Sequence, residues 1–133
     1  MDIINHKRLT LLIQLANADG KVVEEERKFI YDIGERKGFK KSDIDLMFKN
    51  PGAVGSLGAL SLQTSREYLR DMMFLMISDG IVHESEVIFC QQMGIRLGFH
   101  KADVDEVILK IQLGKSEEEV MGFISSLPHP AEN

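Results

Sequence analysis

Apolar residues recur at intervals of three or four over most of this 133-residue chain. That is the spacing of one face of an α-helix. The pattern predicts helices over residues 4–18, 23–37, 42–48, 64–78, 84–97 and 101–113, with a last helix beginning at residue 116. Residues 72–77 are apolar on every face, so their helix should be enclosed by others. Strand patterns are almost absent, and the expected fold class is all-α, a compact bundle of about six to seven helices.

Local signals refine the expected helix ends. Three pairs have the spacing of a capping box, in which a side chain before the helix and one in its first turn bond each other's backbone amides: Ser42 with Asp45, Thr64 with Glu67 and Ser116 with Glu119. Glycines in "AVGSLGALSL" predict a loop there, with its leucines turned into the core.

The chain contains an internal repeat. Residues 12–46 and 72–106 align without a gap, and 14 of the 35 aligned positions are identical. An internal duplication explains such a match, and we expect residues 1–133 to form one domain from two related helix-turn-helix repeats. The two copies should pack face to face around a pseudo-two-fold axis. Gly34 and Gly94 lie inside predicted helices, where glycine is unfavourable, so they should mark a close approach between helices.

The most unusual chemistry in the repeat is the motif D-G-x-x-x-x-x-E, at residues 19–26 and 79–86. One interpretation is architectural. If a helix begins after Val23 in the first copy, Glu26 occupies its third position, where a carboxylate can accept the free amide hydrogen of the residue before the helix. The aspartate would bond its own turn, and the glycine would supply a left-handed backbone conformation.

The other interpretation is a divalent-metal site. Its ligands would be the four repeated acids Asp19, Glu26, Asp79 and Glu86, because carboxylates suit hard cations. His83 could add a nitrogen ligand in the second copy only. The motif also matches the second half of an EF-hand loop, but the first ligand position of that loop would be Leu15 or Leu75.

Charge and composition narrow the function. A net charge of −5 repels phosphate backbones and anionic lipid, so neither nucleic acid nor bare membrane is an expected partner. No apolar run reaches the roughly 18 residues of a membrane span, and no signal peptide is evident, which leads us to expect a cytoplasmic location. The single Cys90 lies in an apolar helical stripe and should be a core residue. No catalytic motif occurs, so we do not expect an enzyme.

The doubled motif D-G-x-[IV]-x-x-x-E between apolar helices resembles the tellurite-resistance TerB-like domain family, which also forms the N-terminal part of some membrane-anchored J-domain co-chaperones. The likeness covers roughly residues 4–127 and departs at Val23 and His83, where family members often carry a small hydroxyl. It implies an all-helical fold without known catalysis, whose paired acids have been suggested to hold metal, in proteins linked to stress responses and membrane-associated complexes.

Together these observations predict a non-enzymatic module for binding or assembly in a bacterial stress-associated system, with a protein partner and a divalent metal as its only expected cofactor. The alternative function is a divalent-metal sensor or buffer in which the acidic turns act directly. A third reading is a metal-dependent hydrolase that uses Asp79, His83 and Glu86.

Overall fold

A computed structural model of the chain describes residues 2–129. These residues form helices and loops and contain no strand. The helices are α1 (Ile3–Ala16), α2 (Glu24–Arg36), α3 (Lys41–Lys49), α4 (Leu62–Met76), α5 (Glu84–Arg96), α6 (Lys101–Gln112) and α7 (Glu117–Ser125). The predicted all-α bundle is confirmed, and the bounds of α2 and α5 lie sixty positions apart at both ends, as the repeat requires.

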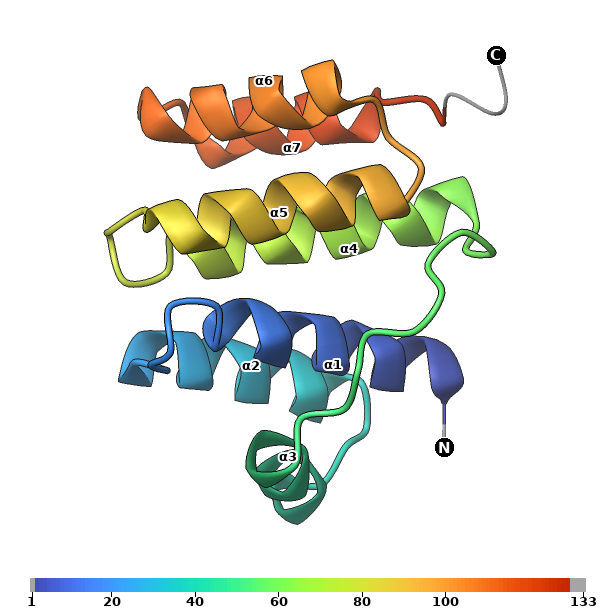
Figure 1. Cartoon of the computed structure of the whole chain (residues 1–133), viewed down its shortest axis with the longest axis vertical. Helices are drawn as coiled ribbons and strands as arrows, with labels where there is room; N and C mark the ends of the chain where they lie inside the picture. Colours follow the sequence, from blue (N-terminus) through green and yellow to red (C-terminus); the bar gives the residue numbers. More distant parts are fainter. Residues whose placement is uncertain (1, 130–133) are drawn as a thin grey trace.

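The helices stack in layers (Figure 1). The pairs α1–α2 and α4–α5 lie next to each other, α6 and α7 cover the outer side of the second pair, and α3 crosses beyond the first. Packing between the pairs is reciprocal: α1 contacts α4, while α1 also contacts α5 and α4 also contacts α2. This is the face-to-face arrangement expected for two copies related by a pseudo-two-fold axis.

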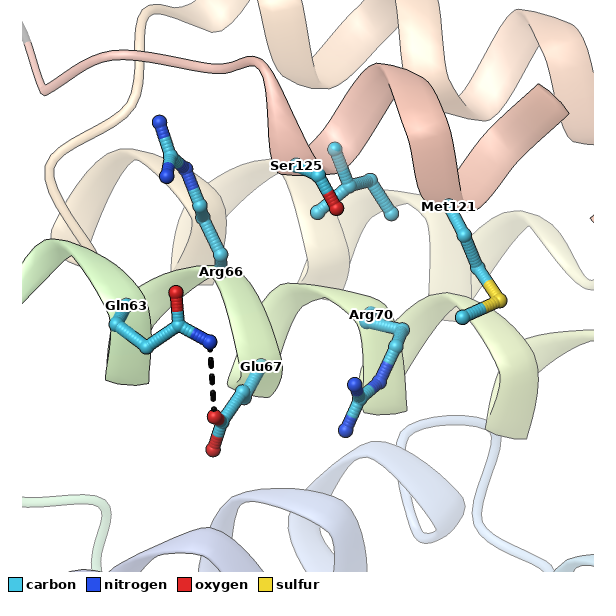
Figure 2. Close-up of a pocket in the computed structure, with 7 residues that line it drawn as sticks. Gln63, Arg66, Glu67, Arg70, Met121 and Ser125 are labelled. Atoms are coloured by element: carbon cyan, nitrogen blue, oxygen red, sulfur yellow. Dashed lines mark hydrogen bonds between the residues drawn. The ribbon is translucent and has the colours of Figure 1, made fainter. Parts of the chain in front are cut away.

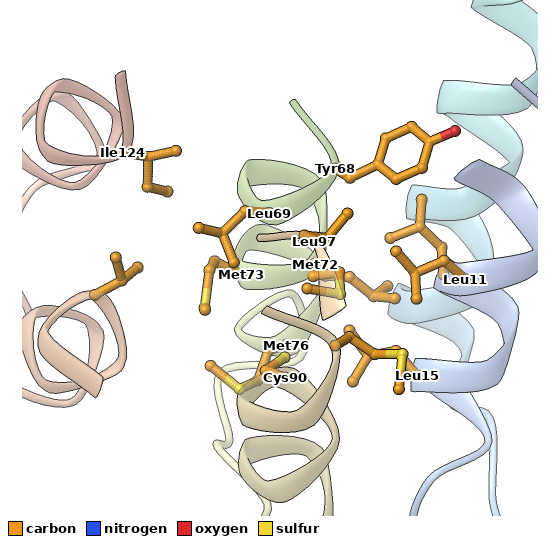
Figure 3. Close-up of a cluster of buried hydrophobic side chains, with 14 of the residues drawn as sticks. Leu11, Leu15, Tyr68, Leu69, Met72, Met73, Met76, Cys90, Leu97 and Ile124 are labelled. Carbon is orange, nitrogen blue, oxygen red and sulfur yellow. The ribbon is translucent and has the colours of Figure 1, made fainter. Parts of the chain in front are cut away.

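The core lies along α4. Met72, Met73, Leu75 and Met76 are all fully buried, which confirms that the helix predicted to be enclosed is a core element. Figure 3 shows α4 between α7 on one side and α1 on the other, with Ile124 of α7 facing it. The thiol of Cys90 on α5 is also fully buried, and burial raises its pKa, so it is an inert core group.

Two of the three predicted capping boxes are wrong. Helix α4 begins earlier than expected, because Ser61 Oγ, and not Thr64, accepts the capping hydrogen bond, from Thr64 N at 3.1 Å. Helix α3 begins at Lys41, so Ser42 lies inside the helix, and Lys40 before it makes no side-chain cap. The third is confirmed as a helix start, since Ser116 Oγ accepts from Glu119 N at 3.1 Å.

Gly34 and Gly94 are points of close approach between helices, as the sequence predicts. A Cβ atom added at Gly94 would lie 2.6 Å from Val104 Cγ2 on α6, and one added at Gly34 would lie 2.6 Å from Ile44 Cδ1 on α3. In each copy a β-branched side chain of the third helix therefore fills the notch that a glycine leaves in the second.

Replacing Gly94 by alanine should destabilise the protein by about 1–3 kcal/mol, because the branched Val104 side chain has few rotamers into which it can retreat. The matched control is Gly122→Ala on α7, where an added Cβ meets no atom within 4 Å. That variant should gain up to about 1 kcal/mol from helix propensity. The free energy of unfolding in urea measures both.

The double variant Gly94→Ala with Val104→Ala separates a steric clash from a general effect of the substitution. Its destabilisation should fall short of the sum of the two single variants by at least about 0.5 kcal/mol, because the truncated side chain makes room for the new methyl group. Strict additivity would contradict the close approach at this site.

Candidate functional site at the paired acidic turns

Each acidic turn has the same geometry in both copies. Asp19 Oδ1 accepts a hydrogen bond from Lys21 N at 3.1 Å, and Asp79 Oδ1 accepts one from Ile81 N at 3.0 Å. Gly20 has φ +83° and Gly80 has φ +80°, a left-handed conformation that other residues rarely adopt. The architectural prediction for these residues is confirmed, and each aspartate retains a second oxygen that is not used in its turn.

The glutamates cap the helices that follow. Glu26 Oε1 accepts from Val23 N at 3.2 Å at the start of α2, and Glu86 Oε1 accepts from His83 N at 3.4 Å at the start of α5. Both carboxyl groups stand at the positive end of a helix dipole, which favours their negative charge. Sequence reasoning predicted this capping role.

The burial of both glutamates was not predicted. Glu26 is 2% exposed and Glu86 is 0% exposed, although glutamate is almost never fully buried unless it is paired. One signal for it was present in the sequence. Each glutamate stands at the third position of its helix, and the duplication places both helix starts at the seam between the copies, where α1 and α2 meet α4 and α5. Burial at that seam depends on how closely α1, α2, α4 and α5 pack, and the repeat alone does not fix this distance.

The two glutamates interact with each other across the seam. Burial raises the pKa of Glu86 to about 9, and hydrogen bonding to Glu26, repulsion from its charge and repulsion from Asp19 act in the same direction. Glu86 Oε2 is buried and receives no hydrogen bond from any donor that the structure describes. A proton held on Glu86 relieves both penalties, because it removes one charge and gives this oxygen a hydrogen to donate.

His83 bridges the two turns. Its Nε2 atom lies 3.5 Å from Asp79 Oδ2 and 3.9 Å from Asp19 Oδ2. The second oxygens of the two aspartates thus face one imidazole, and the first copy has no equivalent because Val23 stands at that position. The metal hypothesis requires the four acids of the two copies to lie together. Glu26 and Glu86 interact directly, and Asp19 and Asp79 both lie near His83.

The metal prediction concerned the same four acids. Residues 2–129 contain no preassembled group of three or more His, Cys, Asp or Glu side chains that could hold a metal ion. Their oxygens have the chemistry that hard cations prefer, but two oxygens are used in capping and two in the turns. An EF-hand loop is excluded, since Leu15 and Leu75, at its first ligand position, are fully buried helical residues of α1 and α4.

The chain matches no protein-family model, no curated protein and no solved structure. Within the part of the chain that the structure describes, no helix is both long and apolar enough to cross a membrane. The functional argument therefore stands on the repeated turns, on the buried carboxyl pair and on the family resemblance of the doubled motif.

The carboxyl pair should make stability depend on pH. The pKa of Glu86 is about 9 in the folded protein against an ordinary value of 4.5, so between these values the folded state binds more protons than the unfolded state. Stability should then fall as pH rises from 4.5 towards 9. Glu86→Gln keeps an acceptor for the cap and carries no charge, so its melting temperature should exceed that of the wild type increasingly as pH rises.

The control is Glu84→Gln, which removes an exposed glutamate two residues earlier on the same helix. Its melting temperature should follow the wild type across the same pH range. If the melting temperatures of the wild type and Glu86→Gln differ by a constant amount from pH 5 to pH 9, Glu86 is ionised throughout. That result would contradict a proton held on Glu86.

Proposed function

We propose that this chain is a non-enzymatic, TerB-like helical module for binding or assembly, whose functional centre is the place where the two acidic turns meet. The observation that carries the proposal is the buried Glu26–Glu86 pair, in which one carboxylate oxygen has no donor. A purely architectural cap needs one oxygen near the helix start. Two caps buried against each other are costly, and a proton or a cation offsets that cost.

A divalent cation is the ligand class that fits this centre. It would take the place of the proton between Glu26 and Glu86, and hard cations favour such carboxylate oxygens over nitrogen or sulfur ligands. Asp19 and Asp79 would complete the ligand set by turning their second oxygens, now near His83, towards the pair. Because binding requires that rearrangement, we expect an affinity in the millimolar range, within the span known for weak calcium sites.

The doubled motif also supports the wider setting of the proposal, which is a stress-associated bacterial system of the tellurite-resistance kind. In that setting the module acts on a protein partner in the cytoplasm, where it can belong to a membrane-associated complex. A dedicated metal sensor or buffer is the alternative. It differs in one measurable property, since a cytosolic sensor binds calcium at about 10⁻⁷–10⁻⁵ M.

Added calcium, magnesium or manganese should raise the melting temperature of the wild type by mass action. The gain should be larger at pH 8 than at pH 6, because the cation competes with the proton of the pair. The measurement is a series of melting curves, first with a chelator and then with each ion at millimolar concentration. The double variant Asp79→Asn with Glu86→Gln should lose the gain.

A matched control removes the same charge elsewhere. Asp32→Asn with Glu35→Gln changes two exposed acids on α2, away from the turns, and should keep the full response to each ion. If the wild type melts identically with chelator and with every ion, the cation part of the proposal is wrong for those ions and the acids are structural. Saturation at micromolar ion would favour the sensor.

A further inference from the structure

A second polar site lies where α1, the end of α2 and α4 meet, and it contains none of the residues of the acidic turns. It is a cavity of about 110 Å³ lined by Arg8, Ile33, Arg36, Lys37, Arg70 and Asp71. Four of these side chains are cationic and one is a carboxylate. Such a concentration of positive charge is unexpected on a chain whose net charge is −5.

Two buried polar atoms of the residues that line this cavity make no hydrogen bond among the residues described. Arg8 is 3% exposed, and its Nη2 atom donates to Glu67 Oε1 at 2.6 Å. Its Nε atom is buried and makes no hydrogen bond among the residues described. The nearest acid oxygen is Asp71 Oδ2 at 3.7 Å, which is too far for a hydrogen bond and is itself buried without a donor.

The rim is formed by cations, of which Arg36 donates a hydrogen bond from its Nε atom to Asp32 O at 3.2 Å. Arg36 and Lys37, at the end of α2, are exposed. Figure 2 shows the end of the Arg70 side chain pointing away from α7, in a neighbouring pocket that Arg70 lines together with Met121 and Ser125. Its guanidinium lies 3.3 Å from Asp71 Oδ1. Burial raises the pKa of Asp71 despite this neighbour.

The internal repeat offers a comparison within the molecule. Sixty positions away, the counterparts of Arg8, Lys37 and Asp71 are Tyr68, Leu97 and Leu11, which are all buried and uncharged. The counterpart of Arg36 is Arg96, whose Nη2 atom donates to Gly55 O at 2.8 Å. The second junction is therefore largely uncharged and its arginine is bonded to the loop, whereas the first is charged and its arginine is bonded within α2, to Asp32 O. The backbone packing that the two junctions share is therefore compatible with charged or uncharged side chains at these positions.

We propose that the junction of α1, α2 and α4 binds a phosphate-class oxyanion through Arg8, Arg36 and Lys37. The Arg8 guanidinium places a fixed positive charge in the cavity wall, and the two cations at the rim supply charge-assisted hydrogen bonds. The cavity of about 110 Å³ has room for several water molecules, since about 10–15 Å³ measured in this way holds one. One tetrahedral oxyanion fits that space, whereas a nucleotide needs a cleft several times larger.

The test uses inorganic phosphate as the probe. At constant pH and ionic strength, chloride is replaced stepwise by phosphate, up to about 50 times the dissociation constant. The melting temperature should rise, by about 5 °C when phosphate is at roughly ten times the dissociation constant. Isothermal titration measures the affinity directly. Arg36→Ala with Lys37→Ala should weaken binding at least about tenfold, since a hydrogen bond to a charged group accounts for that much affinity.

The control variant is Lys40→Ala with Lys49→Ala, which removes two exposed positive charges that do not line the cavity. It should bind phosphate like the wild type. Both double variants change only exposed side chains, so each should melt near the wild-type temperature in chloride. No response of the wild type to phosphate, or an equal loss of binding in both double variants, would overturn the proposal.

A phosphate monoester can be free or part of a lipid headgroup, and sedimentation with vesicles distinguishes these sources. Vesicles of phosphatidylcholine with phosphatidate are compared with vesicles of phosphatidylcholine alone. Pelleting that requires both phosphatidate and the Arg36–Lys37 pair would support the site and assign it to a headgroup. Phosphate binding without pelleting would support the site and assign it to a free oxyanion.

Discussion

The packing of α1 against α4 is the constraint on which the rest of the structure depends. The two helices belong to different copies of the repeat, and each also contacts the second helix of the opposite copy. Their facing residues, among them Leu15 and Leu75, are fully buried. Because this seam is closely packed, the turns that follow α1 and α4 are brought together, and so are the caps of α2 and α5.

The buried carboxyl pair is a direct result of that symmetry. A duplicated helix start places one glutamate in each copy, and a face-to-face seam leaves both near the axis. The seam converts an ordinary cap into an interaction between like charges, which one proton relieves. Symmetry is also broken here, since His83 replaces Val23 and contacts both aspartates. The site therefore consists of a symmetric inner pair of acids and an asymmetric outer cluster.

Most of the fold could be predicted from the sequence, because helical periodicity and the repeat are both strong local signals. Helix starts were less predictable. Ser61 and Thr64 are both good caps, and the choice between them depends on where the preceding loop positions Leu62, which is a tertiary effect. The four acids were identified by their repetition. The charged cavity was not, because Arg8 comes from α1, Lys37 from the turn after α2 and Arg70 from α4, and none of them has a repeated counterpart that would draw attention to it.

The ion pairs of Arg8 have a consequence for how the two halves recognise each other. Arg8 in the first half contacts Glu67 and Asp71 in the second. The positions equivalent to these acids in the first half are Lys7 and Leu11. Two first halves from different chains would therefore place arginine against lysine, whereas unlike halves gain an ion pair. These charges therefore favour the pairing of unlike halves over the pairing of like halves.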